Sequence, residues 1–257
     1  MATYKKKVTE KGAGKKSSEN MKSTTAEVFN TLDSTASKSE AFIIKQQKNI
    51  FIALTAIVIV ILGYMAYQKY VVEPKEFEAA DELAFPKKYF DLAVSTEVAT
   101  DSLFSLSLNG ADGKYGFVDI ADKYSGTKAG NLANYYAGIA YLKTKDYQNA
   151  ISYLNDFTSK DELLAPIAKG AIGDAFTDIN QPKEALEYYE MAAEMRTNDF
   201  TTPFYLFKAA NTAFELKDYK KATTYFTKIK EEFPSSSEAV NIDLYISKAT
   251  YAGSQEK

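Results

Sequence analysis

Two stretches of this sequence repeat one pattern and decide the fold that it predicts. They read NYYAGIAYLKTKDYQNAISYL (134–154) and AKGAIGDAFTDINQPKEALEYYEMA (168–192). Each is typical of two short helices around a tight turn. Gly138 in the first stretch and Gly173 in the second are 35 positions apart. This recurrence predicts that the chain builds the same pair of helices twice.

Other small and aromatic positions match at the same interval. They are Ala150 with Ala185, Tyr141 with Phe176, and Leu154 with Tyr189. A third copy follows at YLFKAANTAFELKDYKKATTYFTKIKEEFPSS (205–236), in which the two small residues, the aromatic residue and the terminating proline are Ala210, Ala222, Phe226 and Pro234. The three copies therefore share a register.

This spacing resembles the tetratricopeptide repeat, a unit of two antiparallel helices in about 34 residues. The resemblance implies that Gly138 of the first helix faces Ala150 of the second where the two helices cross. It also implies that copies stack, because one helix pair cannot bury its own apolar face. The sequence departs from the pattern in having no Trp, and only the third copy carries the terminal proline.

A continuous apolar segment lies upstream of the repeats. The stretch NIFIALTAIVIVILGYMAYQ (49–68) has twenty residues and no charge. A helix of that length is about 30 Å long, enough to cross the hydrocarbon core of a bilayer. Lysines flank it at Lys45, Lys48 and Lys69. We expect an uncleaved single-pass anchor, and the expected fold class is all-α, one transmembrane helix followed by a short α-solenoid.

The charges are distributed unevenly on the two sides of this segment. Residues 1–48 contain ten Lys and five acidic residues, a net charge of +5. The whole chain has a net charge of −3, so the remainder carries −8. Because cytoplasmic flanks are rich in Lys and Arg, this bias predicts a cytoplasmic N-terminus, contact of the basic tail with membrane lipid, and a periplasmic C-terminal domain at the inner membrane.

The expected organisation has five parts. Capping boxes at Thr24 and Ser37 predict two helix starts before the span, and Pro86 predicts a helix break near Phe85. The parts are a basic, mostly disordered tail with one short helix (1–37), a juxtamembrane and transmembrane helix (38–72), a helical linker with a degenerate first repeat (73–130), three repeats (131–236), and a capping helix and tail (237–257), for which Val240, Leu244 and Ile246 are the expected apolar positions.

The chain offers little for catalysis. It has no His and no Cys, which removes the commonest general base, the thiol nucleophile and the best transition-metal ligands. Phosphate-binding glycine loops and metal-ligand spacings are absent from the sequence. Asp174 and Asp178 lie one helical turn apart, and we interpret them as a solvated face or helix cap. We therefore expect no enzyme, no cofactor, no metal, no nucleic acid and no small-molecule substrate.

The resemblance also implies a partner-binding groove on the first helix of each repeat. The groove positions are Leu132, Tyr135, Ile139 and Leu142 in the first repeat, Ile167, Gly170, Asp174 and Thr177 in the second, and Phe204, Phe207, Asn211 and Phe214 in the third. Apolar side chains at these places favour hydrophobic protein segments. The alternative is that the C-terminal helix or the helix of 73–95 fills the groove as core.

The layout as a whole is similar to the YfgM-type ancillary subunits of the bacterial Sec translocon. These combine a basic cytoplasmic tail, one anchor and a short periplasmic solenoid. The resemblance implies a non-enzymatic scaffold that contacts translocon or chaperone subunits and newly exported polypeptides. The alternative is a structural subunit of another envelope assembly, for secretion or outer-membrane biogenesis.

Overall fold

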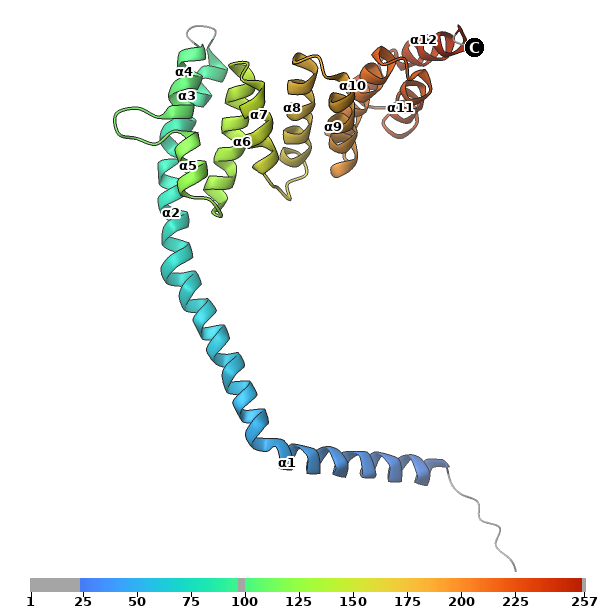
Figure 1. The fold of residues 1–257 in the computed structure, drawn as a ribbon. Coiled ribbons are helices and arrows are strands. Elements are labelled where there is room, and N and C mark those ends of the chain that lie inside the picture. Colours follow the sequence, from blue (N-terminus) through green and yellow to red (C-terminus); the bar gives the residue numbers. More distant parts are fainter. Residues whose placement is uncertain (1–23, 97–99, 256–257) are drawn as a thin grey trace, which may run out of the picture. The chain divides into compact units, whose positions relative to one another are not determined.

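The computed structural model describes residues 24–96 and 100–255, and their regular elements are all helices (Figure 1). The chain divides after Met65 into two compact units. The α-helices are α1 (Thr24–Tyr67), α2 (Glu73–Glu82), α3 (Ala84–Ser95), α4 (Thr100–Asn109), α5 (Phe117–Lys123), α6 (Lys128–Lys143), α7 (Tyr147–Asp156), α8 (Leu164–Asp178), α9 (Pro182–Met195), α10 (Thr201–Glu215), α11 (Tyr219–Glu232) and α12 (Ile242–Gln255).

The first unit is the long helix α1. It is described from Thr24 onward, and it runs through Ser37, where a second helix start was predicted, without a break. The helical segment Ile44–Ser95, which continues from α1 into the second unit, is long and apolar enough to cross a membrane, and the most apolar window within it has no buried residue. These features are consistent with a single-pass anchor. Residues 1–23, where most of the expected basic tail falls, lie outside the described residues.

The second unit starts with helices that continue directly from the apolar segment. A π-helical turn, Gln68–Val72, leads into α2. The chain turns at Leu83 and α3 follows, with Pro86 in its first turn. A proline at this place removes no helical hydrogen bond, since the first N–H groups of a helix have no intrahelical acceptor. Glu76 of α2 accepts hydrogen bonds from the backbone N–H of Lys128 at 3.0 Å, which caps α6.

Three helix pairs, α6–α7, α8–α9 and α10–α11, stand in a row after α5 (Figure 1). Their internal turns repeat closely. Lys145, Asn180 and Lys217 all adopt positive φ angles, of 64°, 57° and 64°. In the first and third turns the next residue, Asp146 or Asp218, caps the second helix with its side chain. These two turns therefore have equivalent structures.

The repeated glycines leave space for a large side chain from the second helix of the same repeat. A Cβ on Gly138 would lie 2.5 Å from Leu154 Cγ, and a Cβ on Gly173 would lie 2.6 Å from Tyr189 Cε1. The atoms nearest to Gly138 thus belong to the residue one turn after Ala150 on the second helix. The alanines at Ala150, Ala185, Ala210 and Ala222 are fully buried, as are Leu154, Tyr189 and Phe226.

The remaining repeat positions pack as ring pairs or end a helix. Tyr141 stacks on Tyr153 with ring centroids 5.5 Å apart, and Phe176 stacks on Tyr188 at 5.3 Å. Because Tyr153 and Tyr188 are also 35 positions apart, each of the first two repeats joins its helices by the same aromatic contact. Pro234 lies in the turn that follows α11.

Both flanks of the repeats differ in part from expectation. Upstream, α3 to α6 share a core in which the ring of Phe90 meets those of Phe104, Phe117 and Tyr136. Downstream, α12 closes the domain, but Val240 and Leu244 are exposed. The expected apolar positions were therefore wrong at Val240 and Leu244. The buried residues of α12 are instead Ile242 and Ala249, which pack in the core shared with α11.

Candidate functional site: the groove of the repeat domain

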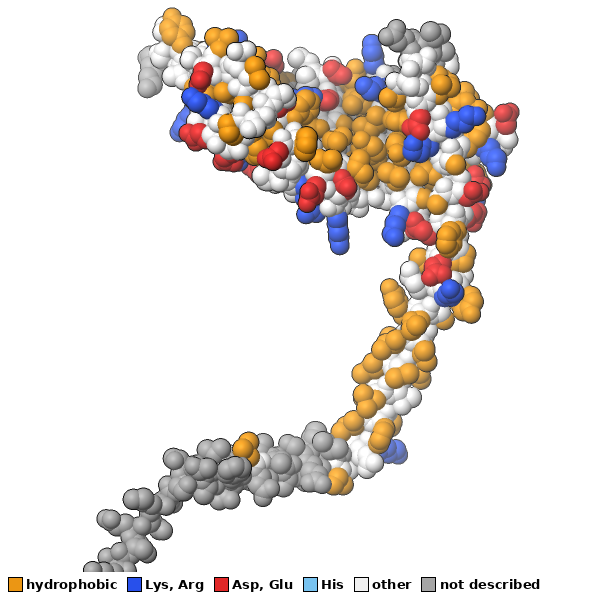
Figure 2. All heavy atoms as spheres, turned by 180° about the vertical axis from the view of Figure 1, so that it is seen from behind, with side chains coloured by type: hydrophobic (Ala, Val, Ile, Leu, Met, Phe, Trp, Pro, Cys, Tyr) orange, Lys and Arg blue, Asp and Glu red, His pale blue; other side chains and the backbone are white. Residues whose placement is uncertain are grey.

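The candidate site is the face built by the first helices of the repeats. Figure 2 shows hydrophobic side chains gathered on the side of the repeat domain that is turned away in Figure 1, mostly in the half nearer α2. Exposed hydrophobic area of this extent is typical of surfaces that bind other proteins. The twelve sequence-predicted groove residues do not all lie open on this face, and each repeat treats them differently.

In the first repeat the groove residues are half-buried. Leu132 packs against the core formed with α2 to α5, so it is partly covered by helices of the same chain. Tyr135 packs on Phe157 with ring centroids 5.2 Å apart. Ile139 and Leu142 pack against the core shared with the second repeat. The N-terminal helices therefore take up part of the face that the sequence assigned to a partner.

In the second repeat Gly170 is covered. A Cβ on Gly170 would lie 1.9 Å from Tyr205 Cε1, so the tyrosine ring of α10 rests directly on the backbone of α8. The expectation that Gly170 lines an open groove is corrected for this reason. Ile167 lies beside a hollow that it shares with Phe200 and Phe204.

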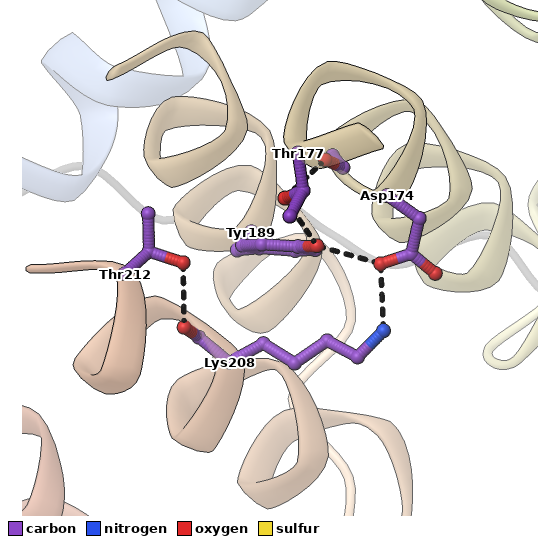
Figure 3. Close-up of polar contacts among 6 residues, drawn as sticks. Asp174, Thr177, Tyr189, Lys208 and Thr212 are labelled. Carbon is purple, nitrogen blue, oxygen red and sulfur yellow. Dashed lines mark hydrogen bonds and ion pairs between the residues drawn. The ribbon is translucent and has the colours of Figure 1, made fainter. Parts of the chain in front are cut away.

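Asp174 joins three helices of two neighbouring repeats (Figure 3). One carboxylate oxygen, Oδ1, accepts a hydrogen bond of 2.6 Å from the hydroxyl of Tyr189 in α9 and a second of 2.6 Å from Nζ of Lys208 in α10. Thr177 Oγ1 lies 3.1 Å from the same tyrosine hydroxyl. Because Lys208 belongs to the third repeat, the network connects the second repeat to the third.

The electrostatics of this network argue for a structural role. Burial raises the pKa of Tyr189, and the hydrogen bond that it donates to Asp174 raises it further. Burial also raises the pKa of Tyr205. The Tyr189 phenol therefore keeps its proton, and with it the hydrogen bond to Asp174, further into the alkaline range than a free tyrosine does. Asp178 lies one turn after Asp174 on α8 and makes none of these hydrogen bonds, although its charge also raises the pKa of Tyr189.

The third repeat contributes the most open part of the face. A hollow of about 550 Å³ lies between α10 and α12, and we call it the α10–α12 groove. Three of the four positions predicted in this repeat line it, namely Phe204, Phe207 and Asn211, together with Thr177 from the second repeat. The fourth, Phe214, does not, since its ring packs on Tyr219 at 5.1 Å and under Nζ of Lys248 at 4.7 Å.

Several residues of the α10–α12 groove were not predicted from the sequence. Tyr245 of α12 packs edge-on against Phe207 with ring centroids 5.0 Å apart. The groove is completed by residues of the segment that follows α11, among them Glu238 and Val240. No repeat position identifies them, because they belong to the closing segment, whose path over α10 depends on packing. The alternative that the C-terminal helix fills the groove is thus only partly realised, since α12 forms one wall.

Comparison with known proteins agrees with this architecture. Tetratricopeptide repeats are found over residues 135–200 and 205–236. Among curated proteins none matches the chain. The protein is an all-helical chain with tetratricopeptide repeats, a class whose repeats indicate a scaffold for protein–protein interaction, and it carries one helix apolar enough to be a membrane anchor.

Metal binding has no support in the described part of the chain. Residues 24–96 and 100–255 hold no group of three acidic side chains close enough to bind one ion.

Proposed function

We propose that this protein is a non-enzymatic scaffold of the inner membrane that works beside a protein-export channel. Its apolar helix holds it in the bilayer with the N-terminus in the cytoplasm, and its repeat domain binds partner subunits or newly exported polypeptides on the outer side. One observation carries the proposal, namely that a span-length apolar helix and a repeat groove with exposed aromatic rings occur in one chain.

The groove suits a polypeptide better than a compact ligand. It is an open surface feature between two helices, its floor is aromatic, and it continues past Phe204 into a second hollow lined by Ile167 and Phe200. Extended segments bind such surfaces by placing successive side chains in adjacent hollows. The acidic pair at Asp174 and Asp178 supports no catalytic alternative, because Asp174 is occupied by Tyr189 and Lys208.

Site-specific crosslinking tests the proposal. A photoreactive residue is placed at Ile57 in the apolar helix or at Val240 in the groove of the full-length protein, and adducts are identified from intact membranes. We expect channel subunits at the first site and partner subunits or exported chains at the second. Adducts only to proteins of a different envelope assembly would support the structural-subunit alternative and contradict the export role.

Orientation is tested separately by protease protection. In cells whose outer membrane has been opened, added protease should remove the repeat domain and spare the lysine-rich N-terminus, because the positive flank is retained in the cytoplasm. Cleavage of the N-terminus with a protected repeat domain would contradict the proposed topology.

A further inference from the structure

We propose that the α10–α12 groove selects polypeptide segments in which Lys or Arg residues flank apolar side chains. This inference rests on the proposed function, since it names the chemical class of segment that the repeat domain would take. It goes beyond the expectation of a hydrophobic partner because the charged side chains that line the groove without an ion-pair partner are both carboxylates.

The floor of the groove provides the apolar contact. Phe204 is 41% exposed and Val240 is 66% exposed, although both lie beside buried core. The rings of Phe207 and Tyr245 meet edge-on between them and are held from below by Phe226, 5.7 Å from Phe207 and 5.3 Å from Tyr245. Covering these exposed side chains with those of a partner would remove apolar area from water, which favours binding.

The charged residues that line the groove are Lys208, Glu215 and Glu238. Lys208 is already paired within the protein, since its Nζ is 2.6 Å from Asp174 Oδ1 and 5.0 Å from the centroid of the Phe204 ring. In the part of the repeat domain that the structure describes, Glu215 and Glu238 form no ion pair. The groove therefore presents two uncompensated carboxylates and no free cation.

Negative charge near the groove also favours basic segments. Asp199 borders the neighbouring hollow, which shares Phe204 and Glu238 with the α10–α12 groove. The chain beyond residue 48 has a net charge of −8. A negative field of this kind attracts basic segments and disfavours acidic ones, and rim charges act mainly on specificity and association rate. Complementarity of charge thus selects a basic and apolar segment over an acidic one.

The side chain of Asn211 offers an acceptor for the backbone N–H of a bound segment. The side-chain amide of Asn211 donates to the carbonyl oxygen of Phe207 at 2.9 Å, which fixes its orientation. Its carbonyl oxygen Oδ1 has no hydrogen-bond donor within the described repeat domain and can accept from the main chain of a bound segment.

The test uses the full-length protein in nanodiscs of zwitterionic lipid, with empty nanodiscs to subtract binding to lipid. Three short fluorescent peptides are compared by anisotropy. In the first, Lys flanks a core of Leu and Phe; in the second, Glu replaces each Lys; in the third, Ser replaces the core. We expect the first peptide to bind most tightly and its affinity to fall as salt is raised.

Two double variants isolate the charge. Glu215→Gln with Glu238→Gln should weaken binding of the Lys peptide about fivefold, because two rim ion pairs are lost. Glu231→Gln with Glu232→Gln removes the same charge from the end of α11, outside the groove, and should change the affinity less than twofold. Phe204→Ser should abolish binding of all three peptides, and circular dichroism shows whether each variant is folded.

Two results would overturn the proposal. One is equal affinity for the Lys and Glu peptides, and the other is an equal effect of the groove and control double variants. If Phe204→Ser still loses its crosslinked partners in either case, the scaffold function stands and only the charge selection fails. If none of the groove variants loses its partner crosslinks, the proposed function itself is contradicted.

Discussion

The apolar helix and the repeat domain use similar residues but bury them in opposite ways. In α1 the side chains of Ile57, Ile59 and Leu62 are all more than half exposed. In the repeats, the residues that are fully buried include small ones such as Ala150 and Ala185. The difference lies in the pattern, because a helix that is apolar all round needs an apolar solvent, whereas a periodic stripe can be covered by a neighbouring helix.

The largest expected effect comes from a charge placed in the apolar helix. Ile57→Arg places a charge in the middle of the expected span, at a cost of about 3 kcal/mol for insertion. We expect much of the protein to leave the membrane fraction, measured by carbonate extraction, while the repeat domain stays folded. Leu244→Arg is the matched control, since Leu244 is also more than half exposed but lies on α12, and this variant should stay in the membrane.

The next prediction applies one small substitution to both regions. Gly170→Ala forces a Cβ into the ring of Tyr205 and should lower the free energy of unfolding by about 2 kcal/mol. Gly63→Ala meets no atom within 4 Å and should leave it unchanged. Thermal unfolding followed by circular dichroism measures both, and equal effects would show that α8 and α10 do not approach each other at Gly170.

The third prediction concerns the polar contact between repeats. Asp174→Asn removes the charge that accepts from both Tyr189 and Lys208, and we expect a loss of about 1.5 kcal/mol in the free energy of unfolding. The control is Asp178→Asn, one turn further along the same helix and exposed. A larger loss for the control in chemical denaturation would contradict the assigned network.

The smallest effect depends on pH. The pKa of Tyr189 is raised in the folded protein above its ordinary value of 10.0, so the folded state holds the proton more tightly than the unfolded state does. Its contribution to stability is complete below pH 10 and is lost as pH rises above it, by about 1 kcal/mol between pH 10 and 11. Tyr189→Phe should reduce this alkaline loss, and an unchanged pH profile would show that the phenol is not buried.

Much of the repeat architecture could be predicted from sequence because its signals are local. The interval of 35 residues, the small residues and the turns at Asp146 and Asp218 all lie within one helix pair. The contacts between pairs could not be predicted. Tyr205 covers Gly170, and Lys208 reaches Asp174, across 35 and 34 positions, and no rule of spacing distinguishes these side chains from others on the same helices.

The candidate site shows the same limit. Phe204, Phe207 and Asn211 were placed in the groove by their repeat positions, and they line it. Phe214 occupies an equivalent position and yet packs away from the groove, since its ring contacts the ring of Tyr219 and Nζ of Lys248. Glu238 and Tyr245 reach the groove from a segment that carries no repeat signal.

The sequence by itself determined that this protein has a span-length apolar helix and stacked helix pairs, because continuous hydrophobicity and a recurring interval are properties of the chain. Only the tertiary structure decided which part of the groove remains open. That outcome depends on how the flanking helices pack, with α2 to α5 covering the first repeat and α12 forming one wall at the third. Side-chain volumes and helix positions, which no single repeat encodes, settle it.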